Sequence, residues 1–200
     1  MKRAFDFFVS IFFLTTLAPL LATVAFLIFI FDGWPILFLQ SRVGEKGKIF
    51  KIFKFRTMKL RSHRFSVPIN MEDDSNQITR FGFVLRNTSI DELPGFVNVL
   101  LGQMSVVGPR PLLPEYLPLY TLHQARRHEV KPGITGWAQV NGRNGISWDQ
   151  KFELDVWYVD NRSFFLDLKI VIKTVGKVLK CDGVSASDEV TMPRFKGKNK

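Results

Sequence analysis

The apolar residues of this chain are concentrated in one long stretch near the N-terminus. Residues 7–31 are 25 positions without a charged side chain, whereas about 20 apolar residues suffice to cross the hydrocarbon layer of a membrane. A core helix of a soluble protein would show a polar stripe, and a cleaved signal peptide has a shorter apolar region of about 7–15 residues. The pattern therefore predicts a membrane segment.

Cations on both flanks of this stretch predict how it sits in the membrane. Lys2 and Arg3 precede it, and a longer series of cations follows it: Arg42, Lys46, Lys48, Lys51, Lys54 and Arg56. Positive flanks favour the cytoplasmic side, and Pro19 breaks or bends a helix near the middle of the stretch. We therefore expect a re-entrant helical hairpin with both ends in the cytoplasm, with a kinked ordinary span as the alternative.

The rest of the chain alternates short periodic segments with loops. Residues 48–64 interleave basic and aromatic side chains without an acidic one, which predicts a β-rich stretch lying beside the core or beside anionic lipid headgroups. Helical spacing and Gly- or Pro-rich composition then predict helices over 93–104, 116–130 and 148–179 and loops over 108–114 and 131–144.

Two polar segments complete the pattern. Residues 66–77 contain Glu72, Asp73 and Asp74. We interpret the segment as a solvated loop, because no EF-hand spacing is present, and metal binding is the alternative. Residues 194–200 form a basic tail, which we expect to be mobile.

Composition and charge narrow the class of partner. The chain has 200 residues, of which 46% are hydrophobic, so it is not a disordered protein. Its net charge of +10 points to partners that carry phosphate, namely nucleic acid, an anionic membrane surface or a phosphorylated substrate. The single cysteine, Cys181, excludes an intrachain disulfide and fits a reducing, cytosolic environment.

Adjacent carboxylates at 91 and 92 are the first candidates for chemistry. Ser89 and Glu92 have the spacing of a helix capping box, and Asp91 could instead act as the cap, with Pro94 in the first turn. The same pair could divide the work of catalysis, with one carboxylate as a nucleophile toward phosphorus and the other as a metal ligand or proton carrier. Capping and catalysis are compatible.

Two loops supply further candidates. In Gly108-Pro109-Arg110-Pro111, two prolines fix the backbone on either side of an arginine, which suits bidentate phosphate binding; a solvated surface turn is the alternative. The loop 131–144 combines three glycines with Trp137 and Arg143 and could bind a nucleotide or a sugar. Walker and Rossmann fingerprints and zinc spacing are absent from the sequence.

Taken together, these segments resemble the bacterial sugar transferases, the monotopic phosphoglycosyl transferases. The resemblance covers about residues 1–185 and rests on four stretches in the family's order: 50–58, 89–100, 104–111 and 131–144. Residues 115–118 and 147–158 add a likeness to the small initiating transferases of bacterial N-linked protein glycosylation. The family's helix break is often Ser-Pro, whereas this chain has Ala18-Pro19.

The resemblance implies a mainly helical α+β fold in three parts. A re-entrant membrane helix (1–34) would precede a small cytoplasmic catalytic domain with short strands and interfacial helices (35–185), and a basic tail (186–200) would follow it. It places the enzyme in the bacterial inner membrane, among phospholipids, with the catalytic domain on the cytoplasmic face.

The resemblance also implies an activity and roles for named residues. The expected reaction transfers a sugar 1-phosphate from a UDP-sugar, preferably an acetamido sugar, to undecaprenyl phosphate, with release of UMP, a requirement for Mg²⁺ and no nucleic-acid partner. Asp91 would be the nucleophile on the β-phosphorus and Glu92 its acid/base or magnesium partner, with both carboxylates near the metal. The remaining residues would bind phosphate: Arg110, and more faintly Lys54, Arg56, Arg86 and Arg143.

Two other functions remain open from the sequence. One is a membrane-tethered basic module that binds nucleic acid or anionic lipid through residues 48–64 and the tail. The other is a glycosyltransferase that acts on the same lipid but releases UDP. The nucleotide product distinguishes these from the leading hypothesis.

Overall fold

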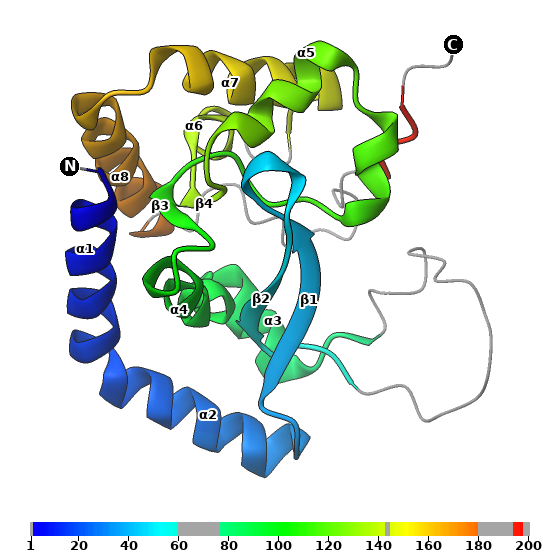
Figure 1. Ribbon diagram of the computed structural model, residues 1–200. Coiled ribbons are helices and arrows are strands. Elements are labelled where there is room, and N and C mark those ends of the chain that lie inside the picture. Colours follow the sequence, from blue (N-terminus) through cyan, green and yellow to red (C-terminus); the bar gives the residue numbers. More distant parts are fainter. Residues whose placement is uncertain (1, 60–76, 143–144, 180–193, 198–200) are drawn as a thin grey trace.

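The computed structural model describes residues 2–59, 77–142, 145–179 and 194–197 (Figure 1). With α for α-helix, η for 3₁₀-helix and β for strand, the first half contains α1 (Lys2–Thr16), α2 (Ala18–Asp32), β1 (Leu37–Val43), η1 (Glu45–Gly47), β2 (Ile49–Phe55), α3 (Arg80–Asn87), η4 (Ile90–Gly95) and α4 (Phe96–Leu100). The second half contains β3 (Ser105–Val107), η5 (Pro114–Leu119), α5 (Leu122–Ala125), η6 (Arg126–Glu129), β4 (Gly133–Thr135), α6 (Trp137–Asn141), α7 (Trp148–Asn161) and α8 (Phe164–Leu179). The predicted mainly helical α+β class is confirmed.

A bend joins the two N-terminal helices. The axes of α1 and α2 differ by 60°, and Pro19 lies in the first turn of α2, where the helix does not need the missing N–H. Backbone hydrogen bonds from Leu17 N to Phe13 O (2.9 Å) and from Leu21 N to Leu17 O (2.8 Å) carry the chain through the bend. Of the described helices, none alone is long and apolar enough to cross a membrane, but this bent pair meets the length and composition criteria together.

The bent pair packs one side against the protein and leaves the other exposed. Phe13 of α1 stacks on Phe96 of α4, with ring centroids 5.0 Å apart, and Ile28 of α2 is buried in a cluster with Leu85 of α3. The opposite sides carry large exposed apolar side chains: Phe7, Phe8, Ile11, Phe12, Leu20, Phe26, Phe29, Ile30 and Phe31. Figure 1 shows the two helices bordering the rest of the fold. A continuous group of exposed apolar side chains marks a contact with a membrane or with another protein.

Two small sheets organise the remaining chain. β1 and β2 form an antiparallel hairpin whose register pairs Leu37 with Phe55 and Arg42 with Phe50, so the predicted β-rich stretch is confirmed for the part within β2. β3 pairs in parallel with β4, Ser105 opposite Gly133. This pairing brings the two candidate loops together so closely that a Cβ at Gly108 would lie 2.3 Å from the carbonyl oxygen of Lys131.

The predicted helix over 116–130 is wrong as a single element. The segment folds as η5, α5 and η6, because Pro118 interrupts the backbone hydrogen bonding inside η5. Thr121 then starts α5 with a capping box, in which its side chain accepts from Gln124 N. The predicted loop over 131–144 likewise contains regular structure, β4 and α6.

Two other predicted helices are also divided. The segment 148–179 forms α7 and α8, separated at Arg162, whose ψ of 128° leaves the helical region; Ser163 Oγ then accepts from Leu166 N (3.2 Å) at the start of α8. The segment 93–104 begins inside η4, which contains Pro94, and continues as α4. Helical structure ends at Leu100. The predicted loop over 108–114 is irregular as far as Leu113, and η5 begins at Pro114.

The C-terminal tail differs from the expectation of mobility where it is described. Phe195 is only 7% exposed and packs in a cluster with Leu112, Tyr116 and Phe152. Its ring centroid lies 5.0 Å from that of Phe152. Aromatic packing therefore holds residues around 195 against η5 and α7. The acidic stretch 66–76, Arg143 and Cys181 lie outside the described residues.

Candidate active site

Asp91 and Glu92 lie side by side in η4. The predicted capping box is wrong: Ser89 adopts a left-handed conformation (φ 57°) and its side chain makes no cap hydrogen bond. The turn is closed instead by the backbone, with Glu92 N donating to Ser89 O (3.3 Å). Because a 3₁₀-helix has three residues per turn, neighbouring side chains project about 120° apart, and the two carboxylates meet different surroundings.

Glu92 is held by cations from two other parts of the chain. Lys54 Nζ, on β2, donates to Oε1 at 2.9 Å, and Arg110 donates to Oε1 at 2.5 Å through Nη2 and to Oε2 at 3.3 Å through Nη1. Burial opposes ionisation of Glu92, but the charges and hydrogen bonds of Arg110 and Lys54 outweigh it and hold the pKa of Glu92 well below its usual range. Glu92 is therefore an anion at neutral pH.

Asp91 has the opposite character. Its residue is 9% exposed, and within the described part of the chain no side chain or backbone group hydrogen-bonds its carboxylate. Burial, followed by the charge of Glu92, raises the pKa of Asp91 to about 6, against the lowering effect of Lys54, Arg110 and Arg86. The carboxylate is mostly ionised at neutral pH, and no described residue occupies its lone pairs. We name Lys54, Asp91, Glu92 and Arg110 the catalytic cluster.

A pocket opens at three residues of the catalytic cluster, Lys54, Glu92 and Arg110, and Asp91 adjoins this lining through its neighbour Glu92. Its lining combines charged side chains with apolar ones and backbone: Arg42, Ile52, Lys54, Glu92, Met104, Arg110, Pro111, Gly133 and Ile134. Burial, together with the charge of Arg110, lowers the pKa of Arg42 to about 10. Three cations against one lining carboxylate favour an anionic ligand.

Arg42 was not among the residues nominated from the sequence. In the hairpin register, Arg42 faces Phe50 and Ile52 faces Gln40. Because directly paired residues lie on the same side of a sheet and the side chains alternate, Arg42 shares its face with Ile52 and Lys54. Strand alternation would identify Arg42 as a site residue only together with the β1–β2 register. That register depends on a strand pairing that the sequence did not specify.

The other predicted phosphate ligands lie outside the pocket lining. Arg56 is buried and donates to the backbone carbonyl groups of Asp32 and Gly33, at the end of α2. Arg86 Nε donates to Thr57 Oγ1 at 2.9 Å and acts on Asp91 through its charge.

The glycine-containing loop contributes backbone more than side chains to the pocket. Gly133 and Ile134 line it, whereas Trp137 stacks on Trp157, with ring centroids 4.9 Å apart. The structure thus gives the Trp137 ring a protein partner, and Arg143 lies outside the described residues.

The fit of a magnesium ion rests on Asp91. No group of three or more His, Cys, Asp or Glu side chains that could hold a metal occurs among the described residues. Mg²⁺ is commonly held by one or two carboxylates together with substrate phosphates, and the free carboxylate of Asp91 suits that arrangement. Glu92 suits it less, because both of its oxygens already accept hydrogen bonds from cations.

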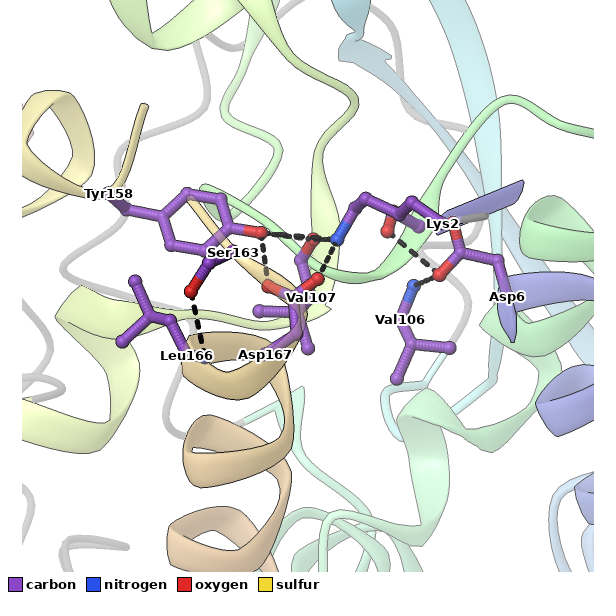
Figure 2. Close-up of polar contacts among 9 residues, drawn as sticks. Lys2, Asp6, Val106, Val107, Tyr158, Ser163, Leu166 and Asp167 are labelled. Atoms are coloured by element: carbon purple, nitrogen blue, oxygen red, sulfur yellow. Dashed lines mark hydrogen bonds and ion pairs between the residues drawn. The ribbon is translucent and has the colours of Figure 1, made fainter. Parts of the chain in front are cut away.

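A second group of charges fastens α1 to β3, α7 and α8 (Figure 2). Lys2 Nζ donates to Asp167 Oδ2 at 2.5 Å and to the Val107 carbonyl oxygen at 3.1 Å. Tyr158 OH donates to Asp167 Oδ1 at 2.6 Å, and Asp6 Oδ1 accepts from Val106 N at 3.0 Å. We name Lys2, Asp6, Tyr158 and Asp167 the α1 anchor. It fixes β3, three residues before Arg110.

Similarity to known proteins identifies the family of this chain. Residues 1–181 match the bacterial sugar transferase family. The chain belongs to this family. It is therefore a transferase enzyme.

Relatives of known name fall into short and long proteins. The chain is 53% identical over 197 residues to the sugar transferase EpsL of Bacillus subtilis (strain 168), covering 98% of this chain and 96% of that protein. It is 39% identical over 186 residues to the UDP-glucose:undecaprenyl-phosphate glucose-1-phosphate transferase of Escherichia coli (strain K12), covering 88% of this chain but only 40% of that protein. The chain is 38% identical over 191 residues to the exopolysaccharide production protein ExoY of Sinorhizobium fredii, covering 88% of this chain and 84% of that protein.

Proposed function

We propose that this chain transfers a sugar 1-phosphate from a UDP-sugar to undecaprenyl phosphate and releases UMP. The observation that carries the proposal is the catalytic cluster, in which a free carboxylate, Asp91, lies beside a carboxylate that collects two cations. The names of the long relatives, such as the undecaprenyl-phosphate glucose phosphotransferase of Komagataeibacter xylinus, support the choice of substrates. The reaction would be a first membrane step of glycan assembly.

The chemistry takes two displacements at phosphorus. In the first, an Asp91 oxygen attacks the β-phosphorus of the UDP-sugar, the bond to the bridging oxygen breaks, and UMP leaves with the bonding electrons. In the second, a phosphate oxygen of undecaprenyl phosphate attacks the same phosphorus and Asp91 leaves as a carboxylate. Three cationic side chains that line the pocket offset the negative charge of the phosphates: Arg110, Lys54 and Arg42.

Glu92 serves this scheme as an organiser of cations. Its pKa lies well below the usual range, so it does not carry a proton at neutral pH. Its two oxygens hold Arg110 and Lys54 where both line the pocket. Entry of a diphosphate gives these cations a second anion to bind, so little reorganisation is needed.

We further propose a magnesium requirement, with Asp91 and diphosphate oxygens holding the ion. Bound Mg²⁺ would supply charge neutralisation on the diphosphate. The free carboxylate of Asp91 supports this proposal, and removal of divalent cations with a chelator should abolish UMP release. Retention of full activity in chelator, with metal content checked by elemental analysis, would contradict it.

We place the enzyme at the cytoplasmic face of the bacterial inner membrane, with α1 and α2 as a re-entrant hairpin among phospholipids. The exposed apolar sides of the bent pair support insertion, and the cations on both flanks support a shared cytoplasmic side. Labelling of cysteines introduced at positions 2 and 46 tests the topology. Access to position 2 from outside the cell, without access to position 46, would show a span and overturn the hairpin.

The sugar is the finest point of the proposal. We propose a UDP-linked acetamido sugar, from the likeness at residues 115–118 and 147–158 to the transferases of protein glycosylation. The relatives include a glucose-1-phosphate transferase, the UDP-galactose-lipid carrier transferase of Erwinia amylovora and an exopolysaccharide production protein, so UDP-glucose and UDP-galactose belong in the same assay. A higher kcat/KM for a hexose would overturn the acetamido choice alone.

One experiment tests the reaction itself. Purified enzyme is mixed with each UDP-sugar and Mg²⁺ without the lipid acceptor, and the protein is analysed by mass spectrometry of the intact chain and of its peptides. We expect a sugar-phosphate adduct on Asp91 and release of about one UMP per enzyme. Release of UDP, or an adduct on another residue, would overturn the two-step scheme.

A further inference from the structure

Arg110 lies in an irregular loop whose backbone is fastened from several sides. Main-chain hydrogen bonds hold the residues around it: Gly108 N to Thr135 O at 2.9 Å, Gly133 N to Pro109 O at 3.0 Å and Val43 N to Leu112 O at 3.0 Å. The carbonyl of Arg110 is held differently, by a side chain. Arg127 Nη2 donates to it at 2.8 Å.

Arg127 is fixed in place by its own surroundings. It is 2% exposed, and its Nη2 and Nε donate to Asp155 Oδ2 of α7 at 2.7 and 3.1 Å. Nη1 donates to Tyr120 OH at 3.3 Å, and the guanidinium lies 5.5 Å from the ring centroid of Phe152. This buried, planar fork has one orientation available to it.

Arg127 is not among the residues that line the pocket, but it contacts the backbone of Arg110, which is. Pro109 and Pro111 restrict the backbone on either side of Arg110, and the hydrogen bond from Arg127 adds a restraint on the Arg110 carbonyl itself. The side chain of Arg110 meets Glu92, while its carbonyl meets Arg127. The hydrogen bond from Arg127 therefore holds the main chain from which the Arg110 side chain reaches Glu92.

We propose that Arg127, oriented by Asp155, is a positioning residue for Arg110 in phosphate binding. The proposal rests on the function proposed above. Small displacements of catalytic groups are costly, on the order of a hundredfold in rate for about 1 Å. Loss of the clamp should therefore reduce turnover while the fold persists.

The test removes the ion pair as a whole. Removing one partner would leave a buried charge unpaired, whereas replacing both with apolar residues of similar volume is often neutral for stability. In Arg127→Met with Asp155→Leu, we expect a melting temperature close to that of the wild type and a kcat/KM for the UDP-sugar lower by roughly a hundredfold. Arg127→Lys, which keeps the charge but loses the fork, should fold and lose roughly tenfold.

The neighbouring residue supplies a matched control. Arg126, also on η6, pairs with Asp160 of the same helix α7, but within the described part of the chain no hydrogen bond links its side chain to the Arg110 loop. Arg126→Met with Asp160→Leu makes the same chemical change and should leave kcat/KM within about twofold, since exposed ion pairs contribute little.

Coupling to Arg110 separates positioning from a general structural effect. In an Arg110→Ala background, the two Arg127 variants should cause little further loss, because the group they position is gone. Full activity in a folded Arg127→Lys or in the folded double variant, or additive losses in the Arg110→Ala background, would overturn the proposal. If Arg110→Ala itself retained wild-type UMP release, the proposed function of Arg110 would fail instead.

Discussion

The catalytic cluster and the α1 anchor are built from the same kinds of side chain, but their carboxylates differ in one respect. In the anchor, Asp167 accepts from Lys2 and Tyr158, and Asp6 accepts from Val106 N and Ser105 Oγ. In the cluster, Glu92 is paired in the same manner, but Asp91 has no hydrogen-bond partner among the described residues. A buried network in which the carboxylates are paired is rigid and holds structure; a free carboxylate beside cations is available for chemistry.

Within the catalytic cluster, the free and the paired carboxylate also differ in the direction of their pKa shifts. Burial raises the pKa of Asp91 to about 6, whereas the cations around Glu92 hold its pKa well below the usual range. Adjacent groups with pKa values pushed apart are typical of active sites. The following predictions test the contrast, from the largest expected effect on turnover to the smallest.

Asp91→Asn should reduce UMP release and adduct formation to background, because an amide cannot act as the nucleophile. Its melting temperature should be equal to or higher than that of the wild type, since burial disfavours the charge that is removed. The matched control is Asp6→Asn in the α1 anchor, which keeps an oxygen acceptor and should keep turnover. Measurable turnover in Asp91→Asn would place the nucleophile elsewhere.

Glu92→Gln should lower kcat/KM on the order of a hundredfold, because one charge that positions Arg110 and Lys54 is lost. The charge of Glu92 also raises the pKa of Asp91, so its removal should move the acidic limb of the pH–rate profile to lower pH. The fall in kcat/KM and the shift of the acidic limb would both be measured from initial rates of UMP release between about pH 4.5 and about pH 8, in steps of about half a pH unit. A lower rate with an unmoved limb would deny the coupling of the two carboxylates.

In the wild type, kcat/KM should rise with pH through about 6, the pKa of Asp91. A nucleophilic carboxylate must be ionised, so at pH 5, one unit below that value, the rate should be about a tenth of the plateau. A melting temperature recorded at both pH values would show that the protein stays folded. A rate that does not change between pH 5 and 7 contradicts the assignment.

Asp6→Ala should have the smallest effect on turnover and a large one on stability. Val106 N–H and Ser105 OH would lose their acceptor, at a cost of about 1–3 kcal/mol for each buried group. We expect a lower melting temperature in detergent, while UMP release per folded molecule at low temperature stays close to that of the wild type. A selective loss of turnover with unchanged melting would show that the anchor serves catalysis directly.

Local chemistry in the sequence was sufficient to nominate much of this protein. The uncharged stretch with Pro19 predicted an apolar helical region with a break, because insertion and helix propagation depend on neighbouring residues. Asp91, Glu92 and Arg110 were also nominated from short segments, and Lys54 through the family resemblance; the structure brings these four together. The helix lengths were less predictable, since Pro118 and Arg162 end elements inside stretches with helical spacing.

The tertiary structure decided which of these groups meet and in what state. Ser89 and Glu92 have the spacing of a capping box, but the box does not form in the fold. The backbone of Ser89 is in the left-handed conformation, and the Glu92 side chain pairs with Arg110. Arg42 joins the pocket through the register of a hairpin. Arg127 meets the Arg110 carbonyl across 17 residues. Such contacts between distant segments depend on packing and burial, and these, rather than residue type, leave Asp91 free and Glu92 paired.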